Sequence, residues 1–137
     1  MNRKLLILGS ILICAIIFVA VQLIFFKKSS PDREVMKFVK DMNKHCPTMV
    51  DIETRLDKVN ALPDNSLQFD YTLIYREKDS IAIGNLKKYM EPVILGKIKT
   101  SPSLSKYIYK DLTWVYSYND KNGEFIFKIT VTPDQLK

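Results

Sequence analysis

A chain of 137 residues, 47% of them hydrophobic and 26% charged, has enough apolar side chains for one folded domain. Its formal net charge of +6 invites a nucleic-acid-binding interpretation. Four of the 21 Lys and Arg residues, however, flank an N-terminal apolar stretch, and all 15 Asp and Glu residues lie beyond it. Residues 29–137 therefore carry a net charge of only +2, and we expect no nucleic-acid partner.

The first feature along the chain is a run of 22 uncharged residues from Leu5 to Phe26. As a helix, this run would be roughly 33 Å long, which matches the ~30 Å hydrocarbon core of a bilayer. The pattern predicts a transmembrane signal anchor at residues 5–26, after an N-terminal tail at 1–4. A short basic linker at 27–30 and a folded domain at 31–137 would follow.

Two other fates of this stretch stay open, a cleaved signal peptide and a lipid-modified Cys14. No small-x-small cleavage site follows it well, and Ile13 precedes Cys14 where a lipoprotein signal needs a small residue. Because basic residues flank the apolar stretch on both sides, the positive-inside rule barely distinguishes the two orientations of the anchor in the membrane. A short tail before the anchor resembles single-pass proteins of the bacterial inner membrane. We therefore expect that membrane, with the C-terminal domain facing the periplasm or the exterior.

A helix should begin near residue 31. Residues 29–32 (Ser-Ser-Pro-Asp) supply hydroxyl caps, a first-turn proline and an acid near the positive end of the helix dipole. Apolar residues then recur at the helical positions Val35, Phe38, Val39 and Met42. Pro47 should end the helix because it disfavours helical conformation in the residue before it.

An antiparallel hairpin and a second helix should come next. Residues 54–59 are predicted to form the first strand, and residues 67–75 alternate apolar and polar side chains after the turn at 62–65. Apolar residues with helical spacing then mark a helix that reaches about residue 100. Pro92 lies inside it, where we expect a kink or a break.

A second hairpin should close the domain. Residues 112–118 and 125–131 alternate around a loop at 119–123 that ends in glycine. The predicted fold class is α+β. After the transmembrane helix, two helices would pack on one face of a four-stranded, largely antiparallel sheet, in the order α-β-β-α-β-β.

Several short segments match a block found in small bacterial domains. They are Cys46-Pro47, Asp51, 54–57 (Thr-Arg-Leu-Asp), 69–73 (Phe-Asp-Tyr-Thr-Leu), 99–102 (Lys-Thr-Ser-Pro) and 130–134 (Thr-Val-Thr-Pro-Asp). Over most of residues 45–134 the chain thus resembles uncharacterised envelope or lipoprotein-like domains. The resemblance implies an α+β envelope domain and brings no assigned activity. Lipoprotein-like members would carry a lipobox, where this chain has an uninterrupted apolar run.

His45 and Cys46 form the one nucleophile-and-base combination in the sequence. Adjacent helical side chains diverge by about 100°, so the thiol and the imidazole are badly placed for mutual hydrogen bonding. We expect an exposed His45 and a Cys46 packed in the core. A reactive Cys46 is the alternative. With one histidine and one usable cysteine, a zinc site lacks ligands, and we expect no metal and no cofactor.

A charged cluster, Asp51, Glu53, Arg55 and Asp57, lies within seven residues. On a strand, the last three would share one face, where opposite charges can pair. We interpret the cluster as an ion-paired surface, with partner recognition as an alternative. Catalysis by a carboxyl group would need a raised pKa, which the neighbouring cations oppose.

A basic run follows, with Glu91 as the one acid between Asp79 and Asp111. Its lysines and interleaved tyrosines are Lys87, Lys88, Lys97, Lys99, Lys106, Lys110, Tyr107 and Tyr109. A solvated helix face explains this pattern without any function. Alternatively, the surface binds anionic headgroups or an acidic partner, with the tyrosines as anchors.

Neither a Gly-rich phosphate loop nor a Gly-x-Ser-x-Gly motif occurs, and we expect no enzyme. The leading hypothesis is a membrane-anchored envelope protein whose domain binds another envelope component, as an accessory subunit or an immunity or inhibitor-type protein. One alternative is a thiol-dependent enzyme or redox sensor that uses Cys46. Another is a lipid or peptidoglycan binding module that uses the Lys87–Lys110 surface.

Overall fold

The computed structural model describes residues 3–25 and 31–137. Helix α1 covers Arg3–Phe25. Within these described ranges, no helix is both long and apolar enough to cross a membrane. The predicted transmembrane signal anchor at 5–26, and the single-pass inner-membrane location derived from it, are therefore wrong. The predicted linker at 27–30 lies outside the described residues, and a domain boundary at residue 31 stays a prediction.

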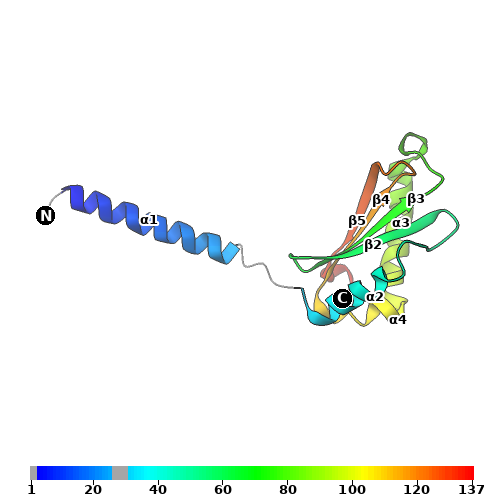
Figure 1. Cartoon of the computed structure of the whole chain (residues 1–137), viewed down its shortest axis with the longest axis horizontal. Coiled ribbons are helices and arrows are strands. Elements are labelled where there is room, and N and C mark those ends of the chain that lie inside the picture. The colour runs from blue at the N-terminus through cyan, green and yellow to red at the C-terminus, as the bar shows by residue number, and fades with distance from the viewer. Residues whose placement is uncertain (1–2, 26–30) are drawn as a thin grey trace.

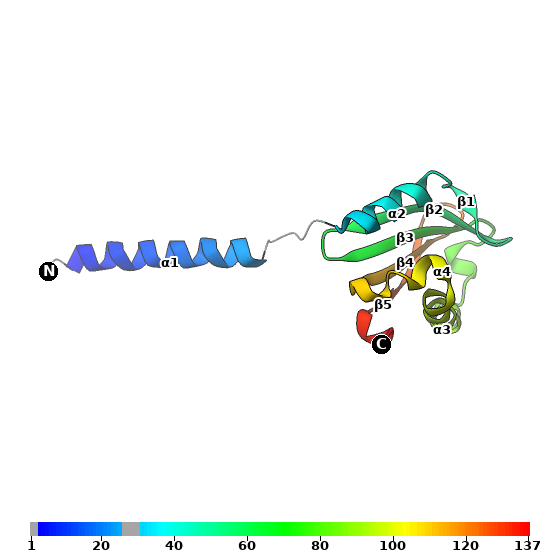
Figure 2. The same ribbon diagram turned by 90° about the horizontal axis from the view of Figure 1, so that it is seen from below.

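From residue 31 onward the chain folds into a five-stranded sheet with helices packed on one face (Figures 1 and 2). The strands are β1 (Thr48–Met49), β2 (Thr54–Leu62), β3 (Ser66–Leu73), β4 (Thr113–Asn119) and β5 (Phe125–Val131). The helices are α2 (Arg33–Asn43), α3 (Ile83–Thr100) and α4 (Pro102–Ser105), with 3₁₀ turns η1 (Lys78–Ser80), η2 (Ile108–Lys110) and η3 (Pro133–Gln135).

The strands follow each other across the sheet in chain order. Both predicted antiparallel hairpins, β2–β3 and β4–β5, are confirmed. The central pair, β3 and β4, is parallel because the long connection through α3 and α4 returns the chain to the end at which β3 began. The predicted four-stranded sheet is wrong. The extra strand, β1, pairs only Thr48 with Leu56 and Met49 with Arg55, and two residues are too short to show an alternating pattern.

The inner face of the sheet is aromatic. Its buried rings are Phe69, Tyr71, Trp114, Tyr116, Tyr118 and Phe127. Neighbouring rings lie 5.0 Å apart between Phe69 and Tyr116 and 5.1 Å apart between Tyr71 and Tyr118. Such pairs add about 0.5–1.5 kcal/mol each beyond their buried area. Helix α2 packs against β2 and helix α3 packs against β5. The two helices therefore cover different halves of the same face, one toward each edge of the sheet.

Local signals in the sequence set several element ends. Asp32 caps α2, since its carboxylate accepts hydrogen bonds from the backbone N–H groups of Glu34 (2.8 Å) and Val35 (3.4 Å). Helix α3 runs through Pro92 without a break, so the break considered there does not occur. Gly123 adopts a φ of 81° in the β4–β5 loop, as the hairpin pattern requires.

Candidate binding groove along helix α2

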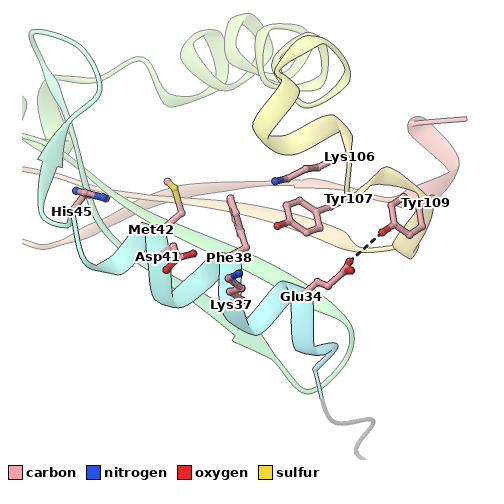
Figure 3. Close-up of a pocket in the computed structure, with 9 residues that line it drawn as sticks. All are labelled: Glu34, Lys37, Phe38, Asp41, Met42, His45, Lys106, Tyr107 and Tyr109. Carbon is pink, nitrogen blue, oxygen red and sulfur yellow. Dashed lines mark hydrogen bonds between the residues drawn. The ribbon is translucent and has the colours of Figure 1, made fainter.

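A groove of about 690 Å³ lies between α2 and the segment that follows α4 (Figure 3). Its lining residues are Glu34, Lys37, Phe38, Asp41, Met42, His45, Lys106, Tyr107 and Tyr109. The residues from α2 recur every three or four positions, so they form one face of that helix. We call this cavity the α2 groove.

The floor of the α2 groove is apolar and tied to the core. The Phe38 ring lies 5.0 Å from the Tyr107 ring and 6.5 Å from the Phe69 ring, measured between centroids. Tyr107 is only 8% exposed, while Phe38 and Met42 are half-buried. The floor is therefore fixed by packing before any ligand arrives.

The rim of the α2 groove carries charges of both signs. Lys37 and Asp41 stand exposed on α2, and the Lys106 ammonium lies 5.1 Å from the centre of the Tyr107 ring on the opposite wall. Asp41 also pairs with Lys44 at 2.8 Å. An apolar floor inside a polar, charged rim is the usual anatomy of a protein-binding surface.

Lys110 pairs with the groove residue Glu34 at the start of α2. Its ammonium contacts Glu34 at 2.8 Å and Asp32 at 3.1 Å, and the Tyr109 hydroxyl donates to Glu34 at 3.2 Å (Figure 3). The hydrogen bond to Glu34 raises the pKa of Lys110. The same ammonium lowers the pKa of both carboxyl groups, mainly through its hydrogen bonds. These contacts hold the start of α2 against η2.

Replacing Lys110 with Met should lower the melting temperature by a few degrees at pH 7. Because the pKa values of Asp32 and Glu34 are lowered in the folded state, their ionised forms stabilise the fold at any pH above the usual carboxyl pKa, and this stability is lost as pH falls through the lowered values. The stability that comes from the raised pKa of Lys110 is lost only as pH rises through that raised value. Thermal unfolding followed by circular dichroism should therefore show a wild-type advantage between about pH 5 and 10 that shrinks toward pH 3.

A matched control for this change is Lys137→Met, because Lys137 pairs with Asp134 in an exposed bridge. It should leave the melting temperature nearly unchanged, as exposed ion pairs contribute little. Equal effects of the two substitutions at every pH would contradict a specific role for Lys110.

The predicted basic run does not form one surface. Lys87, Lys88, Lys97 and Lys99 lie on α3, and Lys87 is 4.0 Å from Glu91. Lys106, Tyr107 and Tyr109 line the α2 groove, while Lys110 is engaged by Asp32 and Glu34. Their use in partner or lipid binding stays a prediction.

The predicted charged cluster at residues 51–57 also separates into distinct contacts. The Asp51 carboxylate accepts from the backbone N–H groups of Glu53 and Thr54, each at 2.8 Å. Glu53 pairs with Arg76 at 3.2 Å, rather than with Arg55. Asp57 pairs with Arg55 and accepts from the Thr72 hydroxyl on the open face of the sheet. Each acid has a structural partner, and recognition by this cluster stays a prediction.

His45 and Cys46 lie in the turn after α2. The Cys46 thiol donates to the Met42 carbonyl at 3.4 Å, and His45 is exposed on the groove wall. Burial, and next the charge of Asp57, raise the pKa of Cys46. The environment therefore favours the unreactive thiol over the nucleophilic thiolate.

Alkylation should report this environment directly. In a Cys14→Ser chain, we expect iodoacetamide to modify Cys46 at neutral pH at roughly a tenth of the rate of an unstructured cysteine peptide, or more slowly. Because the pKa is raised, the rate should keep increasing above the pH at which the peptide levels off. Mass spectrometry of quenched samples measures both rates. Fast labelling near pH 7 would contradict a protected thiol.

Sequence reasoning missed the α2 side of the groove. It placed Phe38 and Met42 on a buried stripe, whereas they form a half-buried floor. It gave no role to Glu34, Lys37 or Asp41. The available signal was the flanking of an apolar stripe by charges of both signs, which marks a helix but does not reveal what packs opposite it.

Together, these observations define a small α+β domain with a groove whose apolar floor is packed against the core. The chain belongs to a family described as a domain of unknown function, DUF8479, whose sequence profile matches residues 30–127. No curated protein matches it.

Two solved structures share the fold. A presumed secreted protein of Pseudomonas aeruginosa has a TM-score of 0.64 at 8% identity, over 77% of this chain and 91% of that one. The pilotin EpsS of the Vibrio vulnificus type 2 secretion system has a TM-score of 0.60 at 9% identity, over 76% of this chain and 89% of that one. Identities this low show a common fold alone.

Proposed function

We propose that the domain is a non-enzymatic binding module of the bacterial envelope that holds a segment of another envelope protein in the α2 groove. The observation that carries the proposal is the groove itself, with Phe38, Met42 and Tyr107 at its floor and charges of both signs at its rim. Buried apolar centres supply most of the affinity of protein interfaces, while charged rims guide association and specificity.

The names of the structural neighbours support the setting. One neighbour is described as secreted, and the other as a pilotin of a type 2 secretion system. An accessory subunit in the envelope needs a binding surface and no catalytic group. In the competing role of a thiol-dependent enzyme or redox sensor, Cys46 would need a lowered pKa, whereas its pKa is raised.

Site-specific photocrosslinking in living cells tests the proposal. A benzophenone amino acid replaces Tyr109 or Lys37, both exposed on the groove wall. The matched control replaces Phe125, an exposed aromatic residue on β5 outside the groove. We expect the two groove positions to give the same light-dependent adduct, with an envelope protein identified by mass spectrometry, and the control to lack it.

Purified components then give a quantitative test. Lys106→Glu reverses a rim charge and removes the ammonium from the Tyr107 ring, and it should weaken binding of the identified partner several-fold. Lys58→Glu is the matched control, since Lys58 is exposed on β2 and does not line the groove. Absence of an adduct at both groove positions, or an equal adduct at Phe125, would contradict the proposal.

A further inference from the structure

Exposed apolar side chains gather around the β1–β2 loop. This loop lies at the end of the domain away from the start of α2 (Figure 2). Between residues 31 and 137, nine large apolar side chains are exposed, and six of them line the two cavities beside this loop. They are Met49, Val50, Ile52, Tyr75, Tyr89 and Val93. Ile52, at the loop tip, is 86% exposed. Such clustering marks an interaction surface, because single exposed apolar residues are otherwise scattered.

The larger of the two cavities is a groove of about 730 Å³ between this loop and the first half of α3. We call it the α3 groove. Helix α3 lines it from Asn85 to Val93, through Leu86, Tyr89 and Met90. At ~1.5 Å per residue, this wall is roughly 12 Å long, or about two helical turns.

Several polar groups around the β1–β2 loop are already paired. The N–H groups of Val50 and Asp51 donate to the Thr54 carbonyl, and that of Ile74 donates to the Glu53 carbonyl. The Glu53 carboxylate is held by Arg76. An extended peptide lying here would leave its own backbone groups unpaired, whereas a helix satisfies them internally. The groove therefore suits a helix.

The lining of the α3 groove carries Asp51, Glu53 and Arg76; Glu53 pairs with Arg76, and the Asp51 carboxylate accepts from two backbone N–H groups. Two exposed positive charges lie beside this lining. Lys88 follows the groove wall on α3, and Lys97 continues the face of Val93 one turn further along. Both are exposed, and among the described residues neither forms an ion pair. A helix that binds here would gain from acidic residues beside its apolar stripe. A second copy of this chain would instead bring the same lysines and repel.

We propose that the α3 groove docks an acidic, amphipathic helix of a partner protein, with its apolar stripe over Ile52, Tyr89 and Val93. This site is separate from the α2 groove, so the domain can hold two segments at once. The helix contributes apolar residues at i, i+3 or i+4, and i+7, which is the spacing that two turns present to a groove.

Peptide selection tests this proposal. A display library of random peptides of about 16 residues, enough for roughly four turns, is selected on the full chain. We expect enriched peptides to be apolar at helical spacing and acidic elsewhere, and to become helical on binding by circular dichroism. Ile52→Glu should weaken a selected peptide by roughly tenfold or more. Lys88→Glu should weaken it several-fold.

Two matched controls separate this effect from nonspecific ones. Phe125→Glu alters an exposed apolar residue on β5, and Lys58→Glu an exposed lysine on β2. Both should leave the affinity unchanged. Enrichment of extended peptides with period-two patterns, or binding that survives Ile52→Glu, would overturn the proposal. So would an Ile52-dependent dimer in analytical ultracentrifugation, or Ile52-dependent sedimentation with anionic vesicles, since these assign the surface to a second copy or to lipid.

Discussion

Replacing Trp114 with Ala should lower the free energy of unfolding by about 3–5 kcal/mol, the largest loss that we expect from one substitution in this domain. The Trp114 side chain is completely buried at the centre of the sheet and stacks on Phe69 with ring centroids 6.3 Å apart. Its register partners on the adjacent strands, Leu67 on β3 and Val131 on β5, are also buried. The surrounding side chains therefore have little room to move into the cavity that alanine would leave. Urea denaturation followed by circular dichroism measures the change.

Trp114→Phe separates ring packing from the indole nitrogen. The Nε1 donor of Trp114 is buried and has no hydrogen-bond partner among the residues that the structure describes, so phenylalanine removes an uncompensated polar group together with part of the ring. We therefore expect Phe to restore a large share of the stability that Ala loses. Tyr75→Ala, at an exposed aromatic position, should change stability by less than about 0.5 kcal/mol. A loss below about 1 kcal/mol for Trp114→Ala would contradict its place in the core.

Strands were predictable where one face is buried and the other is open. In β3, β4 and β5 the aromatic and aliphatic side chains alternate, because only the face under α2 and α3 is covered. Helix α2 was predictable for the related reason that its apolar residues recur at helical spacing and Asp32 caps it. In each case the signal lies within a few consecutive residues.

The parallel pairing of β3 and β4 has no local signal. It depends on how the connection from residue 74 to residue 112 returns across the sheet. Strand β1 is set in the same way by tertiary contact, since its two residues gain their conformation from pairing with β2. Alternation along each strand is compatible with either direction of its neighbour, so sequence reasoning could not choose between them.

The α2 groove could not be derived from the sequence because its walls are far apart in the chain. Phe38 and Tyr107 are separated by 69 residues, yet their rings lie 5.0 Å apart. The sequence did single out Lys106, Tyr107 and Tyr109, but as part of a basic surface with α3. Helix α3 turns its lysines elsewhere, and the wall opposite these residues is α2.

Asn43→Ala should lower the free energy of unfolding by about 2–3 kcal/mol, more than is usual for a partly buried polar residue. The Asn43 amide donates from Nδ2 to the Val59 carbonyl and accepts from the Val59 N–H at Oδ1, each at 2.8 Å. One side chain thus takes the place of a neighbouring strand at this point of β2. Alanine leaves both backbone groups of a fully buried residue without partners.

Asn43→Asp makes the same contact dependent on pH. The ionised carboxylate of this variant still accepts from the Val59 N–H, but its second oxygen faces the Val59 carbonyl and cannot donate. Protonation restores the donor, so folding favours the neutral acid and raises its pKa above the usual carboxyl value. Stability gained this way is complete below the pKa of the unfolded chain and is lost as pH rises through the folded value. The Asp variant should therefore approach the wild type near pH 3 and resemble the Ala variant near pH 7.

Urea denaturation of both variants at each pH isolates this effect from the titration of other groups. An Asp-minus-Ala difference that stays constant over that range would show that Asn43 does not bridge the backbone of Val59.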